Sequence, residues 1–393
     1  MTDLEQKPRL RFKGFTEAWE QRKLKDESNY IVAGGDVDKS KLKESGSYPV
    51  IANALTNDGI VGYYASEFRI DAPAVTVTGR GEVGYAVARK CNFTPIVRLL
   101  SIKTSHDVDF LANNINLKGF VVESTGVPQL TVPKLEDLLL YFPKQISEEI
   151  HIGNMFVKIN DLITLHQRKY EKLKSMKAAL LEKIFPSENE TTPKIRFKGF
   201  TEAWEQRKYG DIAELFRGLT YSPSNIVEHG TRVLRSSNIN EDYFVKSDDD
   251  VFVEDGCINI NYAKDRDILI TSANGSSRLV GKHAVLDNIF NEKVVHGGFM
   301  LLAKTKNPYF LNASMSSTWY KKFIDLYIAG GNGAIGNLSK SDLDNYEFLV
   351  PHNEEQLKIG ELFKNLDAII TLHQRKCEKL KNLKKSLLER MFI

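Results

Sequence analysis

The thirteen residues RFKGFTEAWEQRK occupy positions 11–23, and the same thirteen letters return at positions 196–208. The match extends backwards, because Pro8 corresponds to Pro193 and Leu10 to Ile195. The distance between the copies is far longer than the 20–50-residue unit of a solenoid. The repeat therefore predicts a duplicated domain, with 8–23 and 193–208 as the shared segments that open its two halves.

A second repeat closes each half. TLHQRKYEKLK begins at Thr164 and TLHQRKCEKLK at Thr371, and upstream of them Ile152-Gly153 corresponds to Ile359-Gly360. A weaker match precedes these tails, between PQLTVPKL (128–135) and GNLSKSDL (336–343). Each half consequently contains a short shared segment, a long variable segment and a shared tail.

The shared tails are typical of long helices. Apolar or semi-apolar residues recur with a mean step near 3.5, which is the spacing of a coiled-coil seam. Lys177 and Lys384 interrupt the two stripes at the same place, and Pro186 ends the first helix. We expect spacer helices over 146–185 and 353–393, each a rod of about 50–60 Å. The residues expected to pair the helices or to contact other subunits are Phe156, Ile159, Ile163, His166, Tyr170, Leu173, Phe363, Leu366, Ile370, His373, Cys377 and Leu380.

A long helix with one apolar stripe needs a partner, and two such helices in one chain can supply each other. A pseudo-twofold relation between the halves would make this pair antiparallel. The alternative is two separate helical hairpins, each packed on its own domain. His166 and His373 lie on the seam, where packing is favoured over metal binding because no Cys or second His completes a tetrahedral set.

The variable segments contain short strands with turn residues between them, together with two helical stretches. YPVIANAL (48–55), AVTVTGRG (74–81), VGYAVAR (83–89) and TPIVRLLSIK (94–103) indicate strands in the first segment. The second segment shows the same pattern, so each is expected to be an α+β domain with a curved sheet. The predicted boundaries are 1–145 for the first domain, 186–195 for the linker and 196–352 for the second domain.

Composition restricts the class of protein. The hydrophobic fraction of 42% is high enough for globular cores, and no apolar run reaches the 18 residues that would indicate a membrane span. The three cysteines lie far apart without a CxxC pair, so no zinc site is expected and a cytoplasmic location is favoured. A net charge of +3 implies that any polyanionic partner is held by local patches.

Three short motifs suggest chemistry that their context does not support. GRGEVG (79–84) and GNGAIG (331–336) fit GxGxxG, but the first precedes another predicted strand where a dinucleotide fingerprint needs a helix, and the second is absent from the other half. We interpret both as loops. NPYF (307–310) resembles the signature of amino-methyltransferases but lacks its second proline. No catalytic residue and no metal ligand can be assigned.

The loops after the predicted strands carry small polar residues and cations. Arg can read guanine edges, Asn and Gln can read adenine, and Ser or Thr can read either, whereas Lys suits phosphates. Aligning the strands places 78–80 near 272–277, and Asn53 near Ser237-Asn238. For any one of these residues, a solvated loop position is the alternative. The candidate DNA-binding residues are Lys39, Lys41, Lys43, Asn53, Thr78, Arg80, Thr125, Gln129, Arg235, Ser237, Asn238, Ser272, Asn274, Ser276, Arg278, Asn332 and Asn337.

The whole arrangement resembles the specificity (S) subunit of type I restriction–modification systems. The duplicated RFKGFTEAWEQRK, the PQLTVPKL and GNLSKSDL segments and the twin TLHQRK–EKLK helices carry the resemblance, which covers essentially the full chain. It implies an α+β architecture in which two α/β target-recognition domains, related by a pseudo-twofold axis, are separated by two long antiparallel coiled-coil helices.

The resemblance also implies a function. Each recognition domain would read one half of a split, asymmetric target in double-stranded DNA, while the helices set the gap and dock two modification (methyltransferase) subunits. Two restriction (helicase–nuclease) subunits would complete the enzyme. S-adenosylmethionine, ATP and Mg are then expected on the partner subunits, with no cofactor on this chain, no catalysis by it and no membrane partner. The alternatives are a stand-alone DNA-binding pseudo-dimer, such as a repressor or architectural protein, and a methyltransferase site at NPYF.

Overall fold

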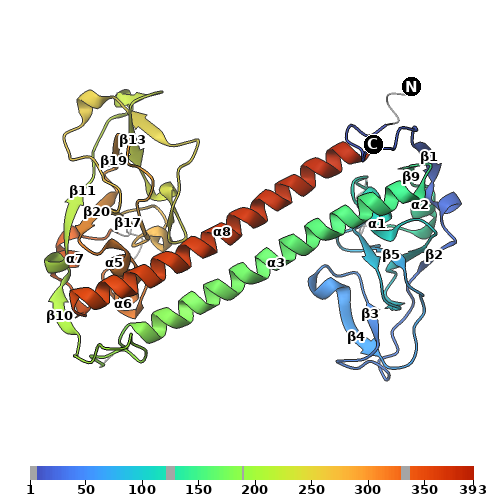
Figure 1. Cartoon of the computed structure of the whole chain (residues 1–393), viewed down its shortest axis with the longest axis horizontal. Helices are drawn as coiled ribbons and strands as arrows, with labels where there is room; N and C mark the ends of the chain where they lie inside the picture. Colours follow the sequence, from blue (N-terminus) through green and yellow to red (C-terminus); the bar gives the residue numbers. More distant parts are fainter. Residues whose placement is uncertain (1–6, 121–128, 188–189, 329–336) are drawn as a thin grey trace. The chain divides into compact units, whose positions relative to one another are not determined.

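The computed structural model describes residues 7–120, 129–187, 190–328 and 337–393, which divide into two compact units (Figure 1). Unit 1 takes in the chain up to Arg168 together with Gln374–Ile393, and unit 2 is formed by Lys169–His373. The two long helices, α3 (Ile146–Ile184) and α8 (Asn353–Met391), each contribute one part to each unit. None of the helices in the described ranges combines the length and apolar character needed to cross a bilayer.

Unit 1 is built on antiparallel pairing in the order β2-β8-β5-β6, beside a smaller sheet in the order β4-β3-β7 and the two-stranded pair β1-β9. The strands are β1 (Glu20–Lys23), β2 (Tyr30–Ala33), β3 (Tyr48–Ile51), β4 (Ile60–Tyr64), β5 (Ala74–Val77), β6 (Ala86–Arg89), β7 (Thr94–Pro95), β8 (Leu100–Lys103) and β9 (Leu139–Phe142). The short helices are α1 (Val108–Asn116) and α2 (Val132–Glu136).

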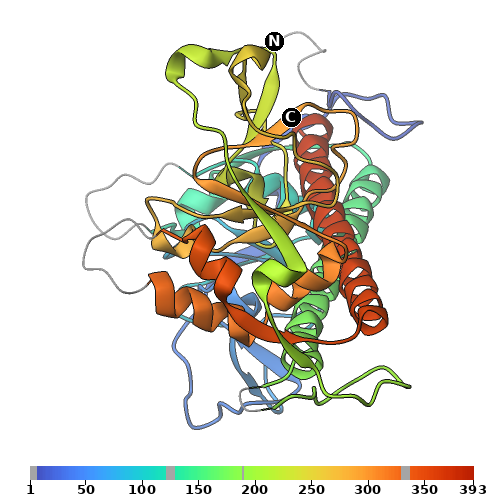
Figure 2. The same cartoon turned by 90° about the vertical axis from the view of Figure 1, so that its left-hand side faces the viewer.

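Unit 2, whose strands run from yellow-green to orange in Figure 2, has sheets in the orders β11-β20-β17-β18 and β12-β16-β13-β19, and the pairs β10-β21 and β14-β15. Its strands are β10 (Glu205–Lys208), β11 (Ala213–Arg217), β12 (Ile226–Val227), β13 (Thr231–Leu234), β14 (Ile239–Asn240), β15 (Tyr243–Phe244), β16 (Val251–Val253), β17 (Ile268–Thr271), β18 (His283–Val285), β19 (Val294–His296), β20 (Met300–Thr305) and β21 (Glu347–Val350). Its short helices are α4 (Tyr209–Ile212), α5 (Pro308–Met315), α6 (Thr318–Ile328) and α7 (Lys340–Asn345).

The two units repeat the same connectivity, which confirms the predicted duplicated α+β fold. The antiparallel order β2-β8-β5-β6 corresponds strand for strand to β11-β20-β17-β18. The parallel pair β3-β7 corresponds to β13-β19, and β1-β9 to β10-β21. The GRGEVG segment lies in the turn of the antiparallel β5-β6 hairpin, as expected, and no helix follows it in the sequence up to β6.

The prediction of one continuous strand over 94–103 was wrong. The structure has two strands, β7 and β8, with a turn between them. Val97 and Arg98 lie in that turn with φ of 49° and 61°, a left-handed conformation that non-glycine residues seldom adopt. The apolar letters of PIVRLL satisfied a strand pattern, whereas the turn depends on tertiary backbone contacts that leave no local signal.

The shared peptide anchors each unit to the C-terminal end of a long helix. In unit 1, Leu10 N donates to Arg390 O at 2.8 Å, and the rings of Trp19 and Phe392 meet edge to face. In unit 2, Ile195 N donates to Lys183 O at 2.9 Å. Trp19 and its repeat equivalent Trp204 are each buried in the core of their own unit.

A bidentate ion pair holds the other side of the same peptide. Arg11 Nε and Nη2 donate to Glu148 at 2.8 and 2.7 Å, and Arg196 donates to Glu355 at 2.9 and 2.7 Å. Both carboxylates lie buried in the first turn of a long helix, where the helix dipole also stabilises a negative charge. The repeated Arg therefore fixes the start of α3 in unit 1 and of α8 in unit 2.

The shared glycines mark a close approach to the long helices. A Cβ on Gly360 would lie 2.8 Å from Phe310 N, and one on Gly153 would lie 2.1 Å from Asp107 Oδ1. Phe310 lies in the first turn of α5, and Asp107 is the N-cap residue of α1. Glycine is consequently required where these short helices abut α8 and α3.

The long helices pair in antiparallel fashion within each unit. In unit 1, Phe156 contacts Phe392, and further along α3 Cys377 Sγ lies 3.4 Å from Gln167 Oε1. The partner residue number falls as the α3 number rises, which is the mark of antiparallel chains. In unit 2, Phe185 meets Phe363 and Lys177 meets Asp367. The predicted seam residues Phe156, Ile159, Phe363, Leu366, Ile370 and Cys377 are buried, and Ile163, His166, Tyr170, Leu173, His373 and Leu380 are half-buried.

The lysine that interrupts each stripe has a different environment in each unit. Lys177 is buried and forms ion pairs with Asp367 on α8 at 2.8 Å and with Asp242, between β14 and β15, at 3.4 Å. The equivalent Lys384 is half-buried, and burial lowers its pKa. Among the described residues Lys384 has no carboxylate within ion-pair distance, so only unit 2 ties a loop of its variable domain to the helix pair in this way.

Candidate nucleic-acid interface

Four separate segments of unit 1 meet in a group that we call loop cluster 1: Asn53, Gly79-Arg80, Val97-Arg98 and Gln129. Gly79 N donates to Asn53 Oδ1 at 2.7 Å, and Asn53 Nδ2 donates to Val97 O at 2.6 Å. Arg80 and Gln129 form an isolated antiparallel bridge, and Leu130 N donates to Gly79 O at 2.9 Å. The predicted candidates Asn53, Arg80 and Gln129, scattered in sequence, therefore lie together.

Unit 2 brings the corresponding segments together in loop cluster 2: Arg235–Ser237, Ser272–Asn274, Phe299 and Asn337. Leu338 N donates to Ser272 O at 2.7 Å, the counterpart of the Leu130–Gly79 bond. Asn274 Nδ2 donates to Ser236 Oγ at 2.8 Å, and Ala273 forms an isolated bridge with Asn337. The alignment of 78–80 with the segment that starts at Ser272 is therefore reproduced by equivalent backbone bonds.

Some predicted DNA contacts serve the protein interior instead. Asn238 is fully buried, where its amide donates to Val245 O and Asp250 and accepts from Arg235 N. Thr78 is buried, with its hydroxyl donating to Glu82 O and accepting from Tyr85 N. Ser272 is buried as well. These three predictions need correction, because side chains that are buried to this extent offer almost no surface to a base edge.

Other candidates are accessible. Ser237, Ser276, Arg278 and Asn337 are exposed, whereas Arg80, Gln129, Arg235 and Asn274 are half-buried. Both amide atoms of Asn53 are already engaged, so this residue shapes the cluster more than it offers a contact. The base-reading role of the accessible residues stays a prediction. Thr125 and Asn332 lie outside the described residues.

The three candidate phosphate-binding lysines precede β3 on the surface of unit 1. Lys39, Lys41 and Lys43 are all exposed. Lys41 is held by Glu67 at 3.1 Å and Asp38 at 3.6 Å, which raise its pKa and offset its charge. Lys39 and Lys43 are therefore the better candidates, since the Lys41 ion pairs would have to open before it met a phosphate.

Two accessible residues in these clusters escaped prediction. Arg98 lies within the stretch predicted as a strand, and Phe299 is not among the predicted contacts. A signal was present in the second case, because Phe299 follows Gly297-Gly298 and two glycines before an aromatic residue are typical of a turn.

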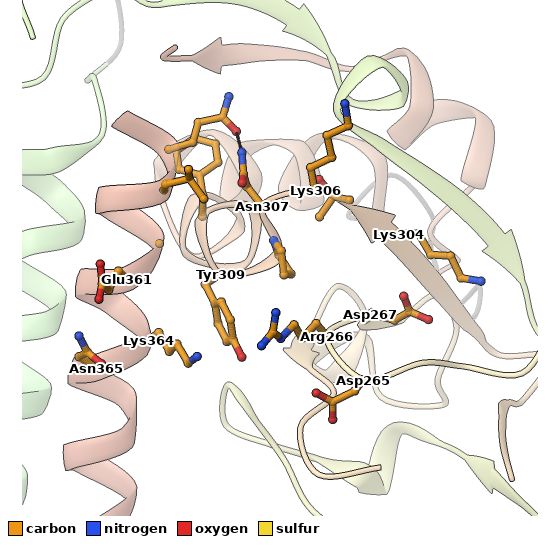
Figure 3. A pocket seen from close by; sticks show the side chains of 16 residues that line it. Asp265, Arg266, Asp267, Lys304, Lys306, Asn307, Tyr309, Glu361, Lys364 and Asn365 are labelled. Carbon is orange, nitrogen blue, oxygen red and sulfur yellow. Dashed lines mark hydrogen bonds between the residues drawn. The ribbon is translucent and has the colours of Figure 1, made fainter. Parts of the chain in front are cut away.

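The NPYF motif lies beside a pocket of about 710 Å³ in unit 2, between α8, the start of α5 and residues 265–267 (Figure 3). Asn307 Nδ2 donates to Asn353 Oδ1 at 2.7 Å and to Gln356 Oε1 at 2.9 Å. Its amide therefore anchors the first turn of α8 and is not presented to a substrate. Burial, with the charge of Asp287, raises the pKa of Tyr309 to about 12, so its hydroxyl is neutral and donates to Asp287 at 3.0 Å.

In unit 1, a histidine with a buried side chain occupies the equivalent sequence position, just before the short helix α1. His106 lies between Glu149 at 2.8 Å and Glu27 at 2.7 Å. Burial alone would lower the pKa of His106, but the hydrogen bonds to and the charges of these two carboxylates outweigh it and raise the pKa. Unit 2 has Lys306 at the corresponding position, next to the residue that precedes α5. No group of three or more His, Cys, Asp or Glu suited to a metal ion occurs in the described part of the chain.

Each unit also exposes apolar side chains on its parts of the long helices. In unit 1, Ile150, Leu162 and Leu165 fall within about 120° of the circumference of α3, at 3.6 residues per turn, in a stripe that borders the seam on one side. Their repeat equivalents in unit 2 are exposed too. The unit 1 set is Ile150, Leu162, Leu165 and Leu383, and the unit 2 set is Leu357, Ile369, Leu372 and Met176. We call these sets helix patch 1 and helix patch 2.

These features define a class of protein in which one duplicated scaffold, including paired parts of two long helices, carries two different surface loop clusters. The chain belongs to the type I restriction modification DNA specificity domain family, whose model matches residues 16–175 and 201–382. It is accordingly a DNA specificity subunit of a type I restriction–modification system. This membership does not favour the stand-alone repressor or architectural protein.

Individual proteins agree with this assignment. The chain is 21% identical over 95% of its length to the type I restriction enzyme MjaVIII specificity subunit of Methanocaldococcus jannaschii, covering 91% of that protein. It is 27% identical over 34% of its length to a putative type I specificity subunit of Mycoplasma pneumoniae, covering 41% of it. The solved S subunit from M. genitalium has the same fold, with a TM-score of 0.72 at 14% identity, over 98% of this chain and 99% of that one.

Proposed function

We propose that each unit reads one half of a bipartite DNA target and that the chain itself catalyses no reaction. The observation that supports this most directly is the contrast between loop clusters 1 and 2. Equivalent backbone bonds, Leu130 N to Gly79 O and Leu338 N to Ser272 O, build both clusters, but the accessible side chains differ. Two readers with one architecture and different side chains suit an asymmetric target.

The proposal extends to the spacer and the location. The two long helices set the gap between the half-sites, because about 39 residues at 1.5 Å each exceed one turn of DNA, about 34–36 Å. The chain recognises its target in double-stranded DNA, in the cytoplasm. S-adenosylmethionine, ATP and Mg belong to the partner subunits, and none is assigned to residues of this chain.

The helix patches are proposed as the docking surfaces for modification subunits. Exposed leucine and isoleucine side chains at repeat-equivalent positions present the same apolar surface twice, once in each unit. Apolar surface exposed in this way is characteristic of contact sites. Two equal surfaces favour two copies of one partner, and two restriction subunits would then join the complex that the modification subunits form.

The test of half-site reading uses the full chain expressed with its modification and restriction subunits. Sequencing of methylated adenines should yield one bipartite motif. Exchanging residues 24–145 for those of another family member should change one half of that motif only, and inserting one helical turn in α3 should alter the gap while both halves persist. A change in both halves after the exchange would refute independent readers.

The proposed docking surfaces are tested by replacing their exposed apolar side chains with charged ones. The double variant Leu162→Glu, Leu165→Glu should lose one modification subunit from the complex, and Ile369→Glu, Leu372→Glu should lose the other, as measured by mass in native mass spectrometry. The four positions are already exposed, so the fold should tolerate the change. Thr164→Glu, exposed on the same helix outside the patch, is the matched control. Full occupancy in both double variants would contradict the assignment.

A further inference from the structure

One turn of each loop cluster has an equivalent backbone position in the two units but carries a different side chain. In unit 1 the turn lies between β7 and β8, and in unit 2 between β19 and β20. Parallel bridges place these turns equivalently, because Gly35 pairs with Ile96 and Leu219 pairs with Gly297. Two residues beyond the bridge, unit 1 has Arg98 and unit 2 has Phe299.

Phe299 is the apolar residue of loop cluster 2, and its side chain is exposed to solvent. It is 74% exposed, although rings of this size normally lie in a core. Its carbonyl oxygen accepts hydrogen bonds from Ser272 N at 2.9 Å and Ala273 N at 3.1 Å. The ring therefore stands on a backbone that is tied directly to the cluster, and it contributes little to the stability of unit 2.

Arg98 occupies the corresponding place with a charge. Arg98 N donates to Gly34 O at 3.0 Å, and the preceding Val97 N donates to Gly35 O at 2.9 Å, which holds this turn in its left-handed conformation. The side chain is exposed, and in the described ranges no carboxylate lies within ion-pair distance of it. The turn that carries this guanidinium is tied to loop cluster 1 by the bond from Asn53 to Val97 O, and a guanidinium without a carboxylate partner suits a polyanion.

We propose that Phe299 and Arg98 are equivalent DNA contacts of opposite chemistry, the ring of Phe299 packing on bases of one half-site and the guanidinium of Arg98 neutralising a phosphate at the other. The inference rests on the proposed function, since it names contacts of the same two readers. Aromatic rings bind bases through their faces and insert at base steps, independently of charge. A cation that meets a phosphate instead releases counterions and makes binding depend on salt.

The experiment measures binding of the full chain, assembled with its modification subunits, to a duplex that contains the methylated motif. Titrations run over salt concentrations from about 50 to 200 mM. Phe299→Ala should weaken binding about 10-fold or more with an unchanged salt slope, and it should reduce discrimination only against base changes in one half-site. Arg98→Ala should lower the salt slope by about one and weaken binding to all sequences alike.

Phe290 provides a matched control, because it is 73% exposed but lies at the other end of β17, where Ile289 N donates to Asp265. Phe290→Ala should leave binding unchanged, and Phe299→Trp should keep binding close to that of the natural chain. The inference is overturned if Phe299→Ala binds as Phe290→Ala does, or if it changes the salt slope. If the unaltered complex recognises no bipartite sequence, the proposed function fails, which is a separate result.

Discussion

In unit 1 the pair Arg11–Glu148 ties the shared peptide to α3 at 2.7–2.8 Å, and in unit 2 the pair Arg196–Glu355 ties it to α8 at 2.7–2.9 Å. The loop clusters show no such identity. Arg98 in one unit is replaced by Phe299 in the other, although the backbone around them is equivalent. Identical residues thus maintain the scaffold, and different residues occupy the surface where contacts are proposed.

This contrast teaches where tolerance to change should be found. A substitution in the scaffold acts on folding, and its effect should differ between the two units only where the surrounding contacts differ. A substitution in a loop cluster should act on one half-site and leave folding unchanged. Variants at the places where the scaffold is least symmetrical test the first part of this contrast.

The largest effect is expected from the buried ion pairs. Arg11→Ala or Arg196→Ala leaves a carboxylate buried without its partner, which should cost about 3–5 kcal/mol of unfolding free energy. The two losses should differ, because Trp19 Nε1 still donates to Glu148 at 3.3 Å, whereas Trp204 Nε1 has no hydrogen-bond partner among the described residues. Arg196→Ala should therefore be the more damaging variant in urea denaturation.

The control for this comparison is Arg207→Ala, in the same shared peptide but on the surface, which should change the unfolding free energy by about 0.5 kcal/mol or less. A larger loss for Arg11→Ala than for Arg196→Ala would show that the tryptophan contact does not support the carboxylate.

The repeats made the fold accessible from sequence alone. Seam residues such as Phe156 and Phe363 recur at the spacing of a coiled coil, and the antiparallel pairing followed from a twofold relation between copies. The candidate site was less accessible. Asn238 and Thr78 are residue types that often contact DNA, and only their burial shows that they bind the protein itself. The residues around Val97-Arg98 do not indicate a turn, because the turn is held by backbone bonds to Gly34 and Gly35, which are distant in the sequence.

A middle-sized effect is expected where the apolar stripe is interrupted. Lys177→Met removes both ion pairs and leaves Asp367, whose pKa is already raised by burial, without a cation in the helix pair. We expect a loss of about 1–3 kcal/mol in unfolding free energy. Lys384→Met should be neutral or stabilising by up to about 1 kcal/mol, because it replaces an ammonium whose pKa is lowered by burial with an apolar side chain.

Urea denaturation of the two methionine variants, measured under the same conditions, tests this difference between the units. Asp242→Asn serves as the intermediate case, since it removes one of the two carboxylates that meet Lys177. Equal losses for Lys177→Met and Lys384→Met would contradict the view that only unit 2 uses this lysine to hold a loop on its helices.

The smallest effect concerns pH and only unit 1. The folded pKa of His106 is raised by Glu149 and Glu27, so the protonated ring stabilises unit 1 fully below its ordinary pKa of about 6.5. This contribution should be lost as pH rises through the folded pKa. Amide hydrogen exchange of α1 should therefore differ between the natural chain and His106→Gln at low pH and converge at higher pH.

The matching peptide of α5 in unit 2 is the internal control, because unit 2 has Lys306 where unit 1 has His106 and so lacks this histidine. Comparing both chains at each pH cancels the intrinsic change of exchange rate. The effect should be smaller than those of Arg11 and Lys177, since a neutral imidazole can still donate one hydrogen bond to a carboxylate. A difference at α1 that grows with pH would mean that the neutral ring is the stabilising form, which is the reverse of the charge arrangement around His106.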